Sequence, residues 1–243
     1  MPLSEEQIDH YFRDGYLIVR GLISPERLAP VRERAAELVN DNDRFQPHIY
    51  QFDHPDTNDP IIHAPFLDER VIKAVEQIFH GPALAYYGFL ALLPARYGKG
   101  LPWHQDNQYT QFHGLALNTF IAVDRVEPDM GHLWIAPGSH RHGTLPSIEA
   151  DEETGTHHRT IDFEPTGGFC LPAFNAGDAV LFDRNTLHRS LENMTDRPRI
   201  CYAAQFVAEH ARLTENGKRS PNAFPPRQLR ESLLGERPTK STG

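Results

Sequence analysis

Short amphipathic stretches fill the first 82 residues of the chain. Ser4 and, three positions later, Gln7 form the capping-box pattern that begins a helix, and apolar residues recur at helical spacing until Gly15. The same reasoning predicts, in chain order, a strand over 16–19, a helix over 24–39 and a helix over 68–79 that ends at Gly81. We expect these elements to support a β core and to carry no chemistry.

A polar stretch from 41 to 65 separates the last two helices. Three prolines interrupt it, which predicts a loop. Its histidines, His48, His54 and His63, have no carboxylate at ligand spacing on a predicted strand. We therefore expect them at the surface or at the rim of a pocket, where the loop would border a substrate entrance.

The remainder of the chain is dominated by short apolar runs separated by glycine and proline. They predict strands over 85–93, 115–124, 132–136, 161–163, 177–183 and 199–208. Since no regular helices intervene, the pattern favours a mainly β protein with helical additions, an antiparallel barrel or jelly roll.

A single domain over 1–243 is the simplest organisation, because one β domain commonly reaches this length and 39% of the residues are hydrophobic. We expect residues 1–82 to be helical support and 83–208 to be the β core. The polar stretch 141–176 is expected to be an insertion that folds over the mouth as a lid. Residues 209–243 form a tail in which Leu229, Leu233 and Leu234 predict a short docked helix.

Charge, hydropathy and cysteine content indicate which partners and which compartment to expect. A formal net charge of -9 argues against a nucleic-acid partner, which needs clustered Lys and Arg. No apolar run approaches the roughly 20 residues that span a bilayer, and the first residues lack the pattern of a signal peptide. Only Cys170 and Cys201 are present, which fits a reducing compartment. We expect a cytoplasmic protein with no membrane partner; its oligomeric state is not readable.

The candidate chemistry centres on Trp103-His-Gln-Asp106 and on His188 about eighty residues later. Side chains two positions apart on an extended segment point the same way, so His104 and Asp106 can hold one ion while Gln105 points elsewhere. With His188 brought in by the fold, the three would form the 2-His-1-carboxylate arrangement of non-haem Fe(II) oxygenases, which leaves other metal positions open.

These residues, together with the segments Gly131–His140 and Gly177–Asp183, make the chain resemble the phytanoyl-CoA dioxygenase family of Fe(II)/2-oxoglutarate oxygenases. The resemblance spans roughly residues 5 to 208. It implies a double-stranded β-helix, the cupin-like jelly roll, with Fe(II), 2-oxoglutarate and O2 as the cofactor and cosubstrates, and with ascorbate as a stimulant. It also implies hydroxylation of a small-molecule substrate with release of succinate and CO2.

Carried over by position, the resemblance makes His104, Asp106 and His188 the catalytic iron ligands. Arg199 would anchor the distal carboxylate of 2-oxoglutarate and Ser190 would hydrogen-bond it. Arg suits this task because its planar fork gives a carboxylate two parallel hydrogen bonds. We expect the strands of His188 and Arg199 to be antiparallel neighbours, with Arg189 pointing away from the barrel.

Arg197 is the other arginine that could bind the distal carboxylate of 2-oxoglutarate. We expect it to be exposed, because it lies at the end of a turn just before Pro198.

Asp106 also bears on which reaction the enzyme performs, because related halogenases lack this carboxylate. A complete triad favours oxygen insertion over halogenation, while desaturation would use the same residues.

The substrate is the least determined part of the prediction. Candidate contacts are Trp103, Gln105, Tyr109 and His132, the last standing where the family usually has a small residue or Cys. The polar run after Asp106 mildly favours a small polar or anionic substrate. Two alternatives stay open: a cupin-like metalloprotein with non-oxidative chemistry, and a non-catalytic domain that binds 2-oxoglutarate or metal.

Overall fold

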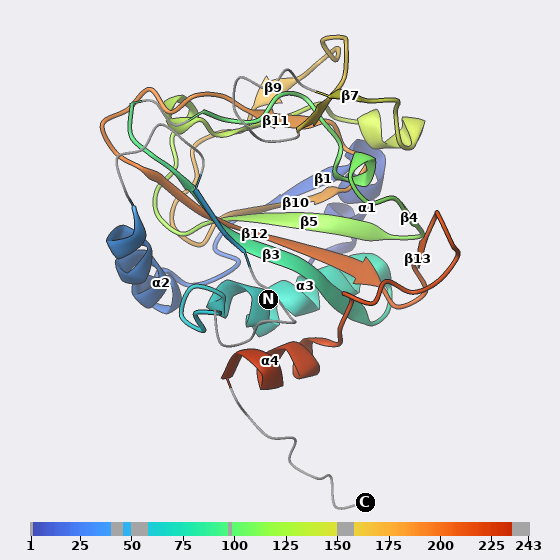
Figure 1. Ribbon diagram of the computed structural model, residues 1–243, viewed down its shortest axis with the longest axis horizontal. Helices are drawn as coiled ribbons and strands as arrows, with labels where there is room; N and C mark the ends of the chain where they lie inside the picture. Colours follow the sequence, from blue (N-terminus) through green and yellow to red (C-terminus); the bar gives the residue numbers. More distant parts are fainter. Residues whose placement is uncertain (1, 40–45, 50–57, 97–98, 150–157, 235–243) are drawn as a thin grey trace, which may run out of the picture.

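Two antiparallel sheets face each other across the centre of the protein (Figure 1). The larger one has six strands in the order β1 (Tyr16–Val19), β10 (Ala179–Asp183), β5 (Ala116–Ala122), β12 (Arg199–Ala208), β3 (Ala83–Leu93) and β2 (Gln46–Ile49). The smaller one has the order β11 (His188–Ser190), β6 (Leu133–Ile135) and β9 (Phe169–Cys170). This computed structural model describes residues 2–39, 46–49, 58–96, 99–149 and 158–234. The mainly β, cupin-like jelly roll expected from the sequence is confirmed.

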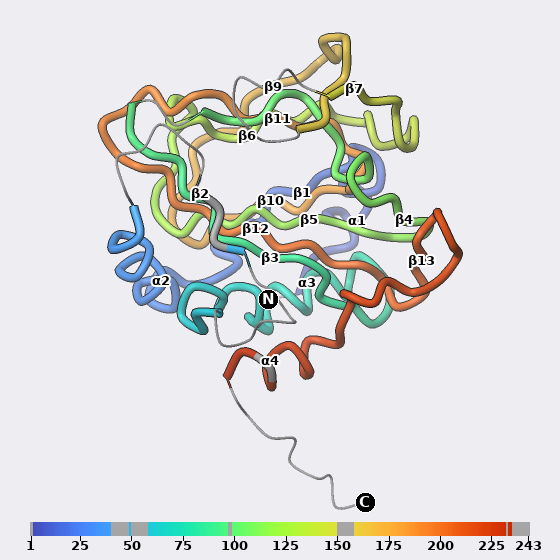
Figure 2. Tube along the Cα trace, viewed as in Figure 1, coloured from blue at the N-terminus to red at the C-terminus, as the bar shows by residue number. Residues whose placement is uncertain are grey.

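Helices cover the outer face of the larger sheet. They are α1 (Glu5–Asp14), α2 (Pro25–Leu38), α3 (Glu69–Phe79) and α4 (Pro226–Leu234). Apolar residues of α2, α3 and α4 share one buried cluster with this sheet, whereas a second cluster fills part of the space between the two sheets. In Figure 2, β12 runs between β3 and β5, which lie far from it in the chain. The central strands are therefore buried on both faces.

The predicted N-terminal elements form largely as expected. Ser4 and Gln7 make the capping box of α1, and Gly15 ends this helix in the left-handed conformation, with φ of 80°. The helix α3 ends at Phe79 as predicted, but the residue that caps it in the left-handed conformation is His80, with φ of 50°, and not Gly81. The short helix of the tail is confirmed as α4, in which Leu229 and Leu233 are buried and Leu234 is exposed.

Three sequence predictions need correction. The expected loop at 41–65 contains the edge strand β2 and the 3-10 helix η2 (Ala64–Leu67). His63 lies neither at the surface nor at a pocket rim, because it is 2% exposed and its Nδ1 lies 2.7 Å from the Tyr202 hydroxyl. The strand expected over 161–163 forms two residues earlier, as β8 (Arg159–Thr160) paired with β7 (Ile148–Glu149). His54 and the side chain of His48 lie outside the described residues.

The C-terminal part of the stretch 141–176 is built into the β core. Its end supplies β9 to the smaller sheet, and Phe174 forms a β-bridge with Val126. The remaining small sheet pairs β4 (Phe112–His113) with β13 (Arg212–Leu213), and short 3-10 helices occur at η3 (Asp106–Gln108), η4 (Pro128–Met130) and η5 (Ser139–His142). Within the described part of the chain, no helix is long and apolar enough to cross a membrane.

Candidate active site

A cavity of about 360 Å³ lies between the two sheets. Its walls are largely apolar and aromatic, with Phe89, Phe120, Leu133 and Phe182 among the lining residues. Among the lining groups with ligand chemistry, His104, Asp106 and His188 lie close enough together to hold one metal ion. A cavity of this size, mostly apolar and with few convergent polar groups, is typical of a small-molecule site.

The fold brings these three residues together from two segments. His104 forms a β-bridge with His188 at the start of β11, and Asp106 is the first residue of η3. The Nε2 atoms of His104 and His188 lie 3.6 and 3.9 Å from Asp106 Oδ1. One ligand atom from each of the three lies within 4.8 Å of the others. This spacing suits a single metal ion.

Hydrogen bonds to the backbone orient both imidazoles. His104 Nδ1 lies 2.7 Å from the Pro102 carbonyl, and His188 Nδ1 lies 2.9 Å from the Thr186 carbonyl. Because a carbonyl can only accept, each Nδ1 carries the proton and each Nε2 presents a lone pair toward Asp106. Tying the outer nitrogen of a histidine to a carbonyl is the usual support of a metal-binding imidazole. The donor set therefore fits a divalent cation.

Burial and charge keep these groups in the ligating form. Burial, followed by the nearby His188, lowers the pKa of His104 to about 4, so its imidazole is neutral at pH 7. Burial alone would raise the pKa of Asp106, but His188, Arg184, His104 and a hydrogen bond from Asn118 together hold this pKa below its usual value. Metal binding at neutral pH then requires no proton to leave either group.

Arg199 and Ser190 line the same cavity. Arg199 is 2% exposed, lies over the Phe120 ring with its Cζ 5.3 Å from the ring centroid, and donates through Nη1 to the Gly131 carbonyl. Its Nε is buried and has no hydrogen-bond partner among the described residues. The Ser190 hydroxyl accepts a hydrogen bond from the Leu101 amide. A buried cation with an unused donor fits an acid that carries a carboxylate.

One geometric prediction about these residues is wrong. His188 and Arg199 do not lie on neighbouring strands, because β11 pairs with β6 in the smaller sheet while β12 pairs with β3 and β5 in the larger one. The two residues face the cavity from opposite sheets. Arg197 is exposed as predicted. The Arg189 guanidinium lies over the Trp103 and Trp134 rings, at 4.8 and 4.7 Å from their centroids.

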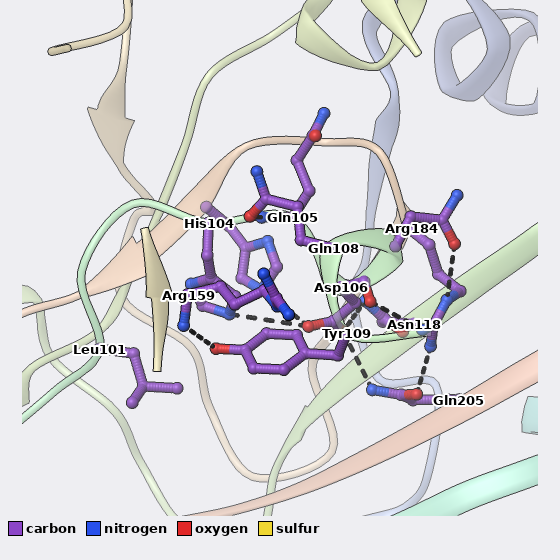
Figure 3. A network of polar contacts seen from close by, with 12 residues as sticks. Leu101, His104, Gln105, Asp106, Gln108, Tyr109, Asn118, Arg159, Arg184 and Gln205 are labelled. Carbon is purple, nitrogen blue, oxygen red and sulfur yellow. Dashed lines mark hydrogen bonds and ion pairs between the residues drawn. The ribbon is translucent and has the colours of Figure 1, made fainter. Parts of the chain in front are cut away.

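Of the four predicted substrate contacts, only Tyr109 lines the cavity. Its ring meets His104 edge-on and its hydroxyl accepts a hydrogen bond from the Arg159 amide (Figure 3). Trp103 is buried in a separate apolar cluster and donates its indole N–H to Glu164. The Gln105 amide is fully buried and bonds backbone groups of Gly143, Leu145 and Asn185.

His132, the fourth, is fully buried between Phe120 and Phe174, and it is not among the residues that line the cavity. Its Nδ1 accepts a hydrogen bond from the Leu133 amide. Burial, with Arg199 as the next cause, lowers the pKa of His132 to about 3. The side chain is therefore a neutral packing residue behind Arg199.

This low pKa predicts a pH dependence of stability in the metal-free protein. Since the folded pKa lies below the unfolded value of about 6.5, only the unfolded chain takes up a proton at His132 as the pH falls from there toward 3. We expect the free energy of unfolding of wild type to fall, relative to His132→Leu, by roughly 1.4 kcal/mol per pH unit in this range. Urea unfolding at several pH values checks this; parallel pH profiles for the two proteins would contradict it.

Several cavity residues were not predicted from the sequence. Asn118, Arg184 and Gln205 converge on Asp106 (Figure 3). Asn118 lies within β5 and Gln205 within β12, two strands that are otherwise mostly apolar. A polar residue within an apolar strand that is buried on both faces was the sequence signal that could have revealed Asn118 and Gln205, since buried polar groups need a hydrogen-bond partner.

Comparison with known proteins agrees with this geometry. The sequence model of the family described as phytanoyl-CoA dioxygenase (PhyH) matches residues 11–201. The chain is 27% identical over 231 residues to ectoine dioxygenase of Halomonas elongata, covering 82% of this chain and 68% of that protein. It is 24% identical over 236 residues to the peroxisomal phytanoyl-CoA dioxygenase of Mus musculus, covering 84% and 68%.

The fold also has solved counterparts. EvdO2 from Micromonospora carbonacea var. aurantiaca, crystallised with 2-oxoglutarate, superposes with a TM-score of 0.72 at 21% identity, covering 90% of this chain and 96% of that one. The family match spans most of the chain, and the structure places two histidines and a carboxylate at one point of the jelly roll. The protein thus belongs to the phytanoyl-CoA dioxygenase family of iron- and 2-oxoglutarate-dependent oxygenases.

Proposed function

We propose that His104, Asp106 and His188 hold Fe(II) and that Arg199 and Ser190 bind the distal carboxylate of 2-oxoglutarate in a hydroxylase of small molecules. The observation that supports this most is the convergence of two imidazole lone pairs on one carboxylate oxygen, in a cavity that also holds a buried, partly unpaired arginine. When bound, iron and 2-oxoglutarate supply the oxidising chemistry, in which O2 is consumed and succinate and CO2 are released.

The chain's own residues would set up this reaction in three ways. The backbone carbonyls of Pro102 and Thr186 hold the imidazoles in the ligating tautomer. Arg199 supplies a fixed positive charge on the cavity wall opposite His188, where it can bind the distal carboxylate of 2-oxoglutarate. The apolar walls around Phe89 and Phe182 exclude bulk water, which strengthens each polar contact inside the cavity.

The substrate is proposed to be a small molecule. A cavity of about 360 Å³ that must also accommodate 2-oxoglutarate favours a small substrate over a long acyl chain. Ectoine is the first compound to test, because a relative of this chain is named ectoine dioxygenase. The two free cysteines fit a reducing compartment, so we expect the enzyme to act in the cytoplasm on a soluble compound.

The experiment is a turnover assay with Fe(II), ascorbate, 2-oxoglutarate and air, to which ectoine or an acyl-CoA is added. We expect succinate in every reaction that contains the intact protein, and an increase with the preferred substrate class, accompanied by a product with one added oxygen atom. Succinate without any stimulation would keep the oxygenase and reject the two compounds. No succinate under any condition would contradict the proposed function and favour a cupin-like protein with other chemistry.

A further inference from the structure

The two carboxylate oxygens of Asp106 face different partners. Oδ1 points toward the Nε2 atoms of the two histidines. Oδ2 accepts hydrogen bonds from Asn118 Nδ2 at 2.5 Å and from Gln205 Nε2 at 3.0 Å (Figure 3). Two amide donors therefore occupy the oxygen that does not face the imidazoles, and Oδ1 is left for the metal position.

Strand pairing brings the two amides to the same place. Gln205 on β12 lies directly opposite Asn118 on β5 in the register of the larger sheet. Both side chains line the cavity and reach Asp106 from the larger sheet, whereas His188 belongs to the smaller sheet and His104 forms a β-bridge with it. Since both strands are held on each side by neighbouring strands, the positions of the two amides are rigidly determined.

Arg184 fixes the orientation of the Gln205 amide. Its Nη1 donates to Gln205 Oε1, so the Nε2 end of this amide is the one turned toward Asp106. The guanidinium also donates to the backbone carbonyls of Asp106 and Thr110 at 2.9 and 3.1 Å and to Asn107 Oδ1 at 3.2 Å. It is 2% exposed, and its Cζ lies 5.6 Å from the Tyr86 ring centroid.

The positive charge of Arg184 is balanced by Asp106 without a direct ion pair. Within the described residues, no carboxylate forms a direct ion pair with this guanidinium. Asp106 is the strongest of the negative groups that favour its charged form. The sequence of contacts from Arg184 through Gln205 to Asp106 therefore links a buried cation to a buried anion by way of a neutral amide.

Asn118 supplies an independent indication that this arrangement serves the site and not the fold. Its Oδ1 is buried and has no hydrogen-bond partner in the described part of the chain. A leucine of similar size would avoid this unmet carbonyl, because burying an unpaired polar group is unfavourable. Within the described residues the side chain makes a single hydrogen bond, which it donates to Asp106, and this bond accounts for an asparagine there.

We propose that Asn118, Gln205 and Arg184 are positioning residues that restrict Asp106 to one metal-ligating oxygen. This inference rests on the proposed function. With Oδ2 retained by two amides, Asp106 cannot turn both oxygens toward the metal, and the position that a second oxygen would take stays available to 2-oxoglutarate. Loss of the amides would free Oδ2, so the metal would stay bound while 2-oxoglutarate binding weakened.

The test uses the full chain loaded with Co(II), which reports its coordination by visible absorption. Metal affinity and then 2-oxoglutarate affinity are measured by calorimetry for wild type, Asn118→Leu and Gln205→Met. We expect unchanged Co(II) affinity in both variants, a 2-oxoglutarate affinity weakened by about tenfold to a hundredfold, and a visible spectrum shifted toward higher coordination. Thermal unfolding checks that both variants remain folded.

Gln77→Leu is the matched control, since this amide also joins two segments, bonding the backbone of Leu3, but does not line the cavity. It should change neither affinity. If both affinities fell by the same factor, or neither fell, in the Asn118 and Gln205 variants, the positioning role would be overturned. If wild type itself bound no 2-oxoglutarate in the presence of Co(II), the proposed function would fail before the variants were compared.

Discussion

His188→Ala should remove both the metal and the turnover. The variant takes away one of three candidate ligand atoms that lie within 4.8 Å of one another, and the alanine left in its place offers no ligand atom. Since loss of a residue that only supports a ligand typically costs 10- to 100-fold, loss of a ligand should lower 2-oxoglutarate turnover by at least about 100-fold. Succinate release and the iron content after dialysis measure the two effects.

His142→Ala is the control for this variant, because His142 is exposed and is not a cavity-lining residue. It should retain full iron content and succinate release. A His188→Ala protein that folds, binds one iron and releases succinate at the wild-type rate would show that His188 is not a ligand.

Arg199→Met should abolish productive binding of 2-oxoglutarate while leaving the metal in place. Removing one partner of a buried, hydrogen-bonded charge pair costs about 2–5 kcal/mol, which corresponds to a loss of affinity from roughly 30-fold to several thousandfold. The metal-free variant should not be less stable than wild type, because burial lowers the pKa of Arg199 and its Nε is unpaired. Calorimetric titration of the metal-loaded protein and thermal unfolding measure the two quantities.

Arg197→Met is the matched control for the arginine variant. Arg197 lies two residues earlier, carries the same charge and is exposed, so its loss should leave 2-oxoglutarate affinity unchanged. Equal losses in the two variants would mean that net charge, and not a buried contact at Arg199, governs binding.

Local sequence patterns were sufficient for much of the fold and for identifying the candidate metal ligands. The capping box at Ser4 and the apolar runs that form β3, β5 and β12 depend on neighbours in the chain, so periodicity reveals them. His104 and Asp106 are two positions apart, which made their common direction predictable. β2 was missed because the stretch is polar and prolines disfavour strands, although an edge strand tolerates a proline such as Pro47.

The remaining features depend on which sheet each strand joins. Arg199 follows His188 by eleven positions, which suggested a hairpin, but the chain crosses from the smaller sheet to the larger one between them. The contact between Gln205 and Asp106, 99 residues apart, follows from the register of β12 against β5, which the order of residues alone does not specify. Trp103 adjoins His104 in the chain and His132 lies in the segment 131–140 that resembles the family, yet neither residue lines the cavity.

In the proposed function, one cavity binds Fe(II) and 2-oxoglutarate together. The most direct measurement is an anaerobic titration of 2-oxoglutarate into the Fe(II)-loaded wild-type protein, followed by calorimetry and by the visible charge-transfer absorption of a 2-oxo acid chelated to Fe(II). We predict saturable binding at one equivalent per chain, with the absorption growing in parallel with the heat. Omitting Fe(II) should abolish binding, and replacing Arg199 by Met should weaken it strongly. A titration with neither heat nor absorption in the iron-loaded wild type would contradict the account.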